Sequence, residues 1–186
     1  FSQAGIYFKN YGHQQLATIS FRGTSASHTN VLWHGIPVNA PTLGLTDFSQ
    51  WNAWLIDDVA IQSGNQGALY GSGSIGGTVF IDHFNKSRVN SASIGFGLGS
   101  FGYNFQGGNA QYKSDHFQGV TNIYREAIEN DFSYPLKGTD LIQTQQNAAA
   151  LSYGLRQELQ YFWKNQRLSM DLLLFYQNRE SQPVIS

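Results

Sequence analysis

The second half of the chain alternates apolar and polar residues over long stretches, and this pattern restricts it to folds built from long β-strands. Leu168, Met170, Leu172, Leu174 and Tyr176 share one parity, whereas Ser169, Asp171 and Gln177 share the other, with interruptions at Leu173 and Phe175. A period of two places successive side chains on opposite faces of a strand. Similar stretches at 91–99, 102–112, 117–128 and 149–164 bring the prediction to five long strands. They exceed the usual strand length of globular proteins.

Turn sequences between these strands are short except at one place. Gly99-Ser100, Lys113–Asp115 and Asn165-Gln166 are short, whereas the segment 129–146 is long and polar. Tight turns combined with an extended loop are typical of a bacterial outer-membrane barrel. Six aromatic residues near strand ends are predicted to form the interfacial girdles of such a barrel: Tyr112, Tyr124, Tyr161, Trp163, Phe175 and Tyr176.

The composition supports a membrane β-barrel. Of the 186 residues only 12% are charged and 15% are aromatic, whereas ordinary domains are about 25% charged. The mean hydropathy is nonetheless -0.32, as expected when apolar residues face lipid and polar residues face a lumen. A net charge of -1 argues against nucleic acid as a partner, and the lack of a long apolar run argues against a transmembrane helix. A β-sandwich of five strands is the alternative.

The first half of the chain has a different pattern. Brief β-rich stretches occur at Leu16–Phe21, Val31–Trp33, Val59–Gln62 and Thr78–Ile81, and Asp47 is a candidate N-cap for one short helical turn. We therefore expect an α+β unit over residues 1–82, a linker over 83–90 and barrel strands over 91–186.

Motifs for catalysis or metal binding are weak in this sequence. Gly71–Gly76 matches G-x-G-x-x-G. A dinucleotide site requires a helix directly after this motif, and here a strand is expected instead. The histidines lack a metal-binding spacing, and no nucleophile elbow is present. We predict neither an enzyme nor a metal site, and we assign the glycines to chain bends and close packing.

Two sequence segments carry a resemblance to a known family. Ile19–Asn39 contains Ile-Ser-Phe-Arg-Gly and Val-Leu-Trp-His-Gly-Ile-Pro-Val-Asn, and 67–81 contains Ala-Leu-Tyr-Gly followed by Ile-Gly-Gly-Thr-Val-Phe-Ile. In this order and spacing they resemble the plug domain of TonB-dependent outer-membrane receptors. The residues that match the plug motifs are Arg22, Gly23, Gly35, Tyr70, Gly71, Gly76 and Gly77. Arg22–His28 is most similar to the cobalamin (vitamin B12) receptors of this family.

The sequence departs from the family pattern at two places. His34 stands where the family has Asp, and Val59–Asn65 lacks the Glu, Arg and Pro of the family segment. The charge pairs that the family forms between plug and barrel are therefore in doubt at these positions. Gln62, Ser63 and Gln66 are the residues expected to substitute hydrogen bonds for them.

The resemblance implies a plug inside a barrel of about 22 strands. We expect this chain to cover the later part of the plug and about five N-terminal barrel strands. It implies import powered by the TonB–ExbB–ExbD complex through an N-terminal box absent from this chain, and location in the outer membrane of a Gram-negative bacterium. Substrate would bind to apical loops, here at Asn10, His13, Gln14, Gln15, Asn39, Thr42, Leu43, Leu45 and Thr46.

These loops carry neutral hydrogen-bonding groups beside apolar ones, with only Lys9 as a nearby cation. This favours cobalamin or a related corrinoid as the ligand, because an anionic ferric siderophore would favour Arg and Lys. A ferric siderophore receptor, a plug-containing module that binds or occludes without transport, and a carbohydrate-binding sandwich are the alternatives. Calcium in outer loops and a surface lipoprotein lid are further features that occur in this family. The weak candidates for calcium ligands in this chain are Glu126, Glu129, Asp131 and Asp140.

Overall fold

The computed structural model describes residues 5–65, 67–81, 89–136, 138, 141–145 and 147–180. The chain divides into two compact units, Phe1–Lys86 and Ser87–Ser186, which we call the first unit and the second unit. The proposed linker 83–90 and Gln66 lie largely or wholly outside the described residues. No helix in the described part of the chain is long and apolar enough to cross a membrane.

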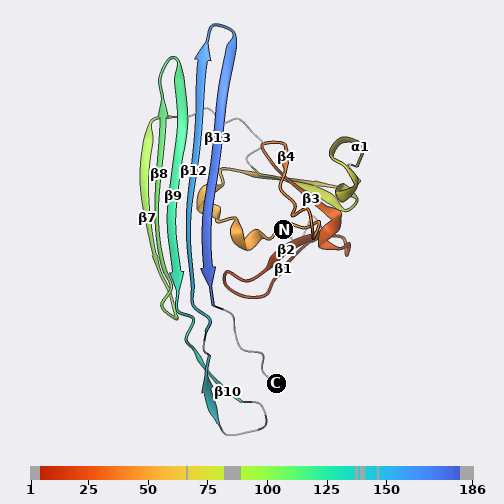
Figure 1. Cartoon of the computed structure of the whole chain (residues 1–186), viewed down its shortest axis with the longest axis vertical. Coiled ribbons are helices and arrows are strands. Elements are labelled where there is room, and N and C mark those ends of the chain that lie inside the picture. Colours follow the sequence, from red (N-terminus) through yellow and green to blue (C-terminus); the bar gives the residue numbers. More distant parts are fainter. Residues whose placement is uncertain are drawn as a thin grey trace. The chain divides into compact units, whose positions relative to one another are not determined.

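The first unit is built on a small mixed sheet and a separate hairpin (Figure 1). The sheet has the order β4-β3-β6-β5, with β3 (Thr29–Trp33) and β6 (Gly77–Ile81) parallel. The antiparallel partners are β4 (Ile36–Pro37) and β5 (Val59–Ser63). The hairpin pairs β1 (Ile6–Asn10) with β2 (Ala17–Phe21).

Short helical turns connect these strands. They are η2 (Ala26–His28), η3 (Phe48–Gln50), η4 (Ala53–Leu55), α1 (Gly67–Tyr70) and η5 (Ser72–Ser74). The prediction of Asp47 as an N-cap is confirmed, because its Oδ1 accepts a hydrogen bond from the backbone N–H of Ser49 at 3.0 Å. Asn52 caps η4 in the same way, through the N–H of Trp54 at 2.9 Å.

The core of the first unit is formed by four fully buried side chains from three strands. Phe21 of β2, Val31 of β3, and Val79 and Ile81 of β6 are at most 1% exposed. All four lie in stretches that the sequence predicts as strands. The predicted strands did not include β1 or β4. β4 has two residues, one of which is proline, and so short a strand gives no β signal.

The second unit is an antiparallel sheet of five long strands that lie side by side (Figure 1). They are β7 (Ser91–Leu98), β8 (Asn104–Lys113), β9 (Phe117–Ile128), β12 (Ala150–Trp163) and β13 (Gln166–Arg179). The predicted strands are confirmed, with 117–128 correct at both ends. The alternative of a β-sandwich is wrong for this unit, because the five strands form one sheet with the order β13-β12-β9-β8-β7.

The long connection between β9 and β12 contains a small hairpin of its own. β10 (Ser133–Pro135) pairs with β11 (Ile142–Thr144). The sequence analysis treated this segment as loop, since each strand has three residues and proline ends the first. The long connection and the turn 99–103 lie at one end of the sheet. The turns 114–116 and 164–165 lie at the other end.

Strand register sorts the second unit into an apolar face and a polar face. The apolar face includes Ile94, Phe96, Leu98, Tyr112, Phe117, Ile123, Tyr153, Leu155, Leu159, Tyr161, Trp163, Leu168, Met170, Leu172, Leu174 and Tyr176. The polar face includes Asn109, Gln118, Asn122, Glu126, Ser152, Arg156, Glu158, Gln160 and Asp171. Apolar residues facing lipid and polar residues facing a lumen are what the sequence pattern predicted.

One polar cluster in the middle of the apolar face satisfies its own hydrogen bonds. Thr121 Oγ1 donates to Gln157 Oε1 at 2.7 Å, and Gln157 Nε2 donates to the Tyr112 hydroxyl at 3.0 Å and the Val120 carbonyl at 3.2 Å. A side-chain amide paired in this way can face hydrocarbon, because its polar atoms need no water.

The predicted girdles need one correction. Tyr112, Tyr161, Trp163 and Tyr176 lie on the apolar face near strand ends, as expected. Tyr124 and Phe175 have the opposite parity and lie on the polar face, each paired with Gly154 across the sheet. Period two decides this, because a position near the end of a strand does not fix the face on which a side chain lies.

Candidate ligand-binding site

The first predicted ligand loop is the tip of the β1–β2 hairpin. Its backbone closes through the Tyr11 N–H to the Leu16 carbonyl at 3.2 Å, and Asn10 Oδ1 accepts from the Gly12 N–H at 2.8 Å. His13 is exposed, Gln15 is half-buried and Gln14 is 8% exposed. Gln14 also has a φ of 53°, so its backbone forms part of the turn.

The second predicted ligand loop runs from Asn39 to Asp47. Asn39 orders it: its Oδ1 accepts from the Val31 N–H at 2.8 Å, and its Nδ2 donates to the carbonyls of Thr29 at 2.9 Å and Gly44 at 3.0 Å. The amide of Asn39 is therefore used largely inside the first unit. Thr42 and Leu43 are exposed, Leu43 by 67%, whereas Leu45 is half-buried and Thr46 is 6% exposed.

Asp47 joins the bases of the two loops. Its Oδ1 accepts from the backbone N–H of Ala17, which follows the hairpin tip, at 3.0 Å. The same oxygen caps η3. A ring contact between Phe8 of β1 and Phe48 of η3, with centroids 6.3 Å apart, supports this junction. The structure thus brings together two loops that are separated by more than twenty residues in the sequence.

Lys9 supplies positive charge beside the hairpin tip. Its Nζ lies 4.6 Å from the centre of the Tyr11 ring, which is a cation–π contact. A hydrogen bond with Tyr11 raises the pKa of the Lys9 amino group. Lys9 is therefore cationic at neutral pH, in a site whose other predicted ligand groups are amides, hydroxyls, one imidazole and aliphatic chains.

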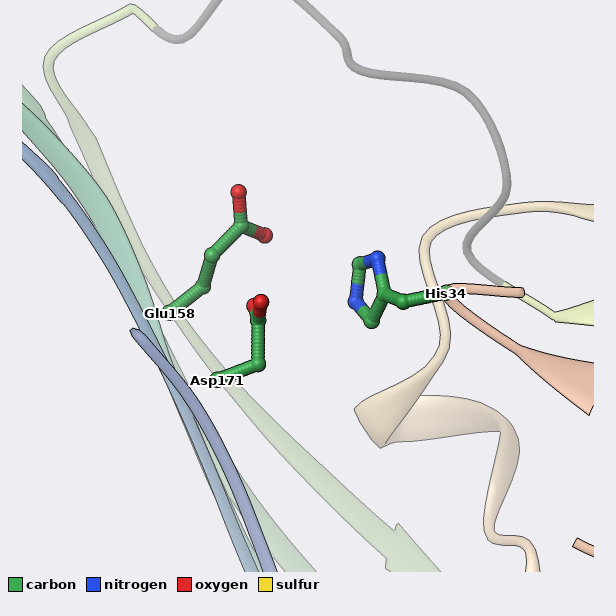
Figure 2. Close-up of side chains that lie close together, drawn as sticks. All are labelled: His34, Glu158 and Asp171. Atoms are coloured by element: carbon green, nitrogen blue, oxygen red, sulfur yellow. The ribbon is translucent and has the colours of Figure 1, made fainter. Parts of the chain in front are cut away.

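The plug-motif residues Arg22, Gly23 and Gly35 occupy chain reversals. Arg22 and Gly23, with φ of 46° and 79°, form the turn after β2. His34 and Gly35, with φ of 48° and 83°, form the turn between β3 and β4, from which the His34 side chain projects (Figure 2). Two consecutive positive φ values are those of a type I′ hairpin turn, which favours Asn, Asp or Gly. Histidine in place of the family's Asp keeps this turn conformation.

The remaining motif residues hold the end of the first unit together. Tyr70 packs its ring on Phe80 with centroids 5.4 Å apart, and its carbonyl accepts from Asn30 Nδ2 at 2.9 Å. Gly71 has a φ of 89°. A Cβ at Gly76 would lie 2.5 Å from Thr24 Oγ1, and a Cβ at Gly77 would lie 2.8 Å from the Gln62 carbonyl. These contacts support our interpretation of the glycines as packing positions, and β6 follows them where a dinucleotide site needs a helix.

The polar face of the second unit carries an ionic network that the sequence analysis missed. Arg156 Nη2 contacts Glu158 Oε2 at 3.0 Å, and the two side chains are 1% and 5% exposed. Gln160 Nε2 donates to Glu158 Oε1 at 2.8 Å, and Gln118 Nε2 donates to Gln160 Oε1 at 2.8 Å. The signal was available, because Arg156, Glu158 and Gln160 share one parity of a predicted strand.

Asp171 on β13 adds a second carboxylate beside this network. It lies opposite Glu158 in the register of β12 and β13, and Figure 2 shows the two carboxylates projecting from the same side of these strands. Of the weak calcium candidates, Glu126 lies on the polar face of β9, whereas Glu129 and Asp131 lie beyond the strand. Asp140 is outside the described residues.

Comparisons with known proteins agree with the fold. Residues 2–78 match the family described as the TonB-dependent Receptor Plug Domain. Over 88 residues the chain is 34% identical to the vitamin B12 transporter BtuB of Vibrio vulnificus, covering 46% of this chain and 14% of that protein. Over 105 residues it is 32% identical to the vitamin B12 transporter BtuB of Photobacterium profundum, covering 56% of this chain and 17% of that protein.

A solved structure resembles the fold over most of the chain. The siderophore receptor PirA from Acinetobacter baumannii matches 93% of this chain and 28% of its own, with a TM-score of 0.64 and 19% identity. The chain therefore spans a minor part of the length of the proteins that it matches. Residues 2–78 are therefore a TonB-dependent receptor plug domain. The chain as a whole is similar to TonB-dependent receptors of the Gram-negative outer membrane.

Proposed function

We propose that this chain is part of an energy-coupled importer of a corrinoid, with cobalamin or a close relative as the substrate. The observation that carries the proposal is the junction at Asp47, which holds the two predicted ligand loops together. Exposed His13, Thr42 and Leu43 present polar and apolar groups from these loops. Such groups suit a bulky ligand that has amides around an apolar ring. The vitamin B12 transporters among the relatives support the same substrate class.

The proposal assigns residues 1–82 to the plug, 83–90 to a linker and 91–186 to the first barrel strands. Import would require the TonB–ExbB–ExbD complex to displace the plug. No covalent chemistry is proposed for these residues. The arrangement of the first unit suits displacement as one piece, because its core is formed within the unit by Phe21, Val31, Val79 and Ile81.

A ferric siderophore is the second candidate, and one specific observation favours it. The cationic Lys9 lies beside the hairpin tip, where it would attract an anionic chelate. The siderophore receptor PirA shares the fold, but at 19% identity this likeness is limited to the fold. A receptor that occludes without transport is the third candidate, and uptake measurements separate it from the other two.

The decisive experiment titrates cyanocobalamin and, separately, ferric siderophores into the full-length receptor. We expect cyanocobalamin to bind with a Kd below about 1 μM. Leu43→Ala and His13→Ala should each weaken binding by about 2- to 10-fold, as expected for the loss of one apolar or hydrogen-bonding contact. Gln15→Ala is the better test of the glutamine pair, because Gln14 is buried in the turn.

Val59→Ala is the matched control, since Val59 is an exposed aliphatic residue of β5 outside both loops. It should leave the affinity unchanged. Absence of cyanocobalamin binding together with tight siderophore binding that Lys9→Ala weakens would replace the first candidate by the second. Binding of cyanocobalamin without energy-dependent uptake would leave the occluding receptor.

A further inference from the structure

Arg125 of β9 occupies an unusual place in the second unit. Register with Gln106 of β8 and Tyr153 of β12 puts it on the apolar face. Within the described strands β7, β8, β9, β12 and β13 it is the only charged residue on that face. An arginine facing lipid costs about 2–4 kcal/mol at the membrane midplane and close to nothing near the interface.

The row that contains Arg125 has the features of an interface. Phe96, Gln106, Tyr153 and Tyr176 lie across the five strands in register with it. The rings of Tyr153 and Tyr176 are 6.4 Å apart, and amphipathic tyrosines collect at headgroup level. This row is near the strand ends joined by the long connection 129–149, which is the extracellular side in a bacterial barrel. Arg125 therefore lies at the level of the outer leaflet.

The guanidinium of Arg125 has little pairing within the protein. Its Nη1 donates to Asn104 Oδ1 at 3.4 Å, and this group has five N–H donors. Its cross-strand and diagonal neighbours on the apolar face of the described strands include no Asp or Glu. The contrast with Gln157 is clear, because that residue is fully hydrogen-bonded in the middle of the same face. Arg125 retains donors for an external anion.

A groove of about 650 Å³ adjoins Arg125. Its walls are side chains of the apolar face, Ile94, Phe96, Ile123, Tyr153, Leu174 and Tyr176, and Gln106 and Arg125 also line it. Gly108 lies between Ile94 and Ile123 in the register, so the row lacks a side chain there. Ile94 and Ile123 are 77% and 52% exposed. The groove is wide enough and apolar enough for an acyl chain.

We propose that this surface binds a phosphorylated lipid of the outer leaflet, with a phosphate on Arg125 and an acyl chain in the groove over Gly108. Arginine pairs with phosphate through two parallel N–H donors. Gln106 in the same row donates from Nε2 to Asn104 Oδ1 at 3.2 Å and has a second N–H for the phosphate. The occupant is chosen by charge complementarity: a cation that lacks an acidic neighbour borders an apolar groove at headgroup level. The proposal rests on outer-membrane location and is independent of the transported ligand.

The test measures binding of lipid A to the full-length receptor in detergent, by native mass spectrometry over a series of lipid concentrations. Lipid A stripped of its phosphates is the second probe. Wild-type receptor should prefer the phosphorylated form, and Arg125→Ala should weaken that binding about tenfold and abolish the preference. Gly108→Trp should weaken the binding of both forms of lipid A, because the indole would occupy the groove. Arg125→Lys should keep part of the preference.

Lys164→Ala is the matched control, because Lys164 also lies beside an aromatic residue, Trp163, but at the opposite strand ends. It should leave lipid A binding unchanged. Equal binding of the two lipids to wild type, or equal losses in Arg125→Ala and Lys164→Ala, would overturn the proposal. The heat-dependent gel mobility of the folded barrel shows that each variant is folded. A wild-type receptor that does not bind cyanocobalamin would contradict the transport proposal and leave the lipid proposal unaffected.

Discussion

The two units of this chain differ in where they place their large apolar side chains. In the first unit Phe21, Val31 and Val79 are at most 1% exposed. In the second unit Ile94 and Leu98 are 77% and 84% exposed, whereas Arg156 is 1% exposed. The first unit removes apolar surface from water by folding on itself, and the second presents apolar surface to lipid. The same side-chain chemistry thus stabilises the two units in different solvents.

Strand length differs for the same reason. Strands of the first unit have five residues or fewer, as in β3 and β4, whereas β12 and β13 each have 14. A strand that crosses a bilayer must be long and must pair all its backbone groups along that length. The first unit has no such requirement, and its chain can turn wherever a glycine or a capping side chain permits it.

The largest predicted effect is a difference in the stability of the first unit between two Phe→Ala variants. Phe21→Ala should destabilise the first unit by about 3–5 kcal/mol, because it empties the centre of the core. Phe96→Ala removes an equal side chain that is 76% exposed on the apolar face, and it should leave the first unit unchanged. Limited proteolysis of the full-length receptor, followed by identification of cleavage sites within residues 5–81, measures this difference. Equal cleavage in both variants would show that the four-residue core does not hold this unit.

A smaller effect should separate the two faces of one strand. Leu172→Arg places a cation in the middle of the apolar face and should cost about 2–4 kcal/mol in the free energy of folding into lipid vesicles. Ser169→Arg lies on the polar face of the same strand and should cost far less. Denaturant titration of the vesicle-inserted receptor measures both. A larger loss for Ser169→Arg would reverse our assignment of the faces.

The second unit was more predictable from sequence than the first, for a physical reason. Period two persists along a strand of 14 residues, so the strand and the partition of its side chains are both evident. Two residues of the predicted girdle, Tyr124 and Phe175, were placed on the wrong face because only their nearness to strand ends was considered. Their parity gives the correct face.

In the first unit the sequence predicted strands and loops but not their contacts. β4 has two residues, too few for any periodicity. The bond from Ala17 to Asp47 joins residues 30 positions apart, and nothing in the local sequence of either loop encodes it. The burial of Gln14 and the internal bonds of Asn39 likewise follow from how the loops pack. The ligand roles of the named loop residues therefore stay predictions.

The smallest predicted effect is the difference in stability between Gly→Ala variants at two glycines. An added Cβ would meet rigid neighbours at one of them and a movable side chain at the other. A Cβ at Gly77 would lie 2.8 Å from the Gln62 carbonyl and 2.9 Å from the Phe21 ring. Neither the ladder nor the core can move cheaply, so Gly77→Ala should cost about 1–3 kcal/mol. A Cβ at Gly108 would lie 3.3 Å from Ile123 Cγ1, and this side chain can rotate on the exposed apolar face. Gly108→Ala should therefore change stability by less than about 0.5 kcal/mol. The two variants are compared by proteolysis for the first unit and by denaturant titration in vesicles for the second. Equal losses would mean that the apolar face is packed as tightly as the core, which would also close the groove over Gly108 to an acyl chain.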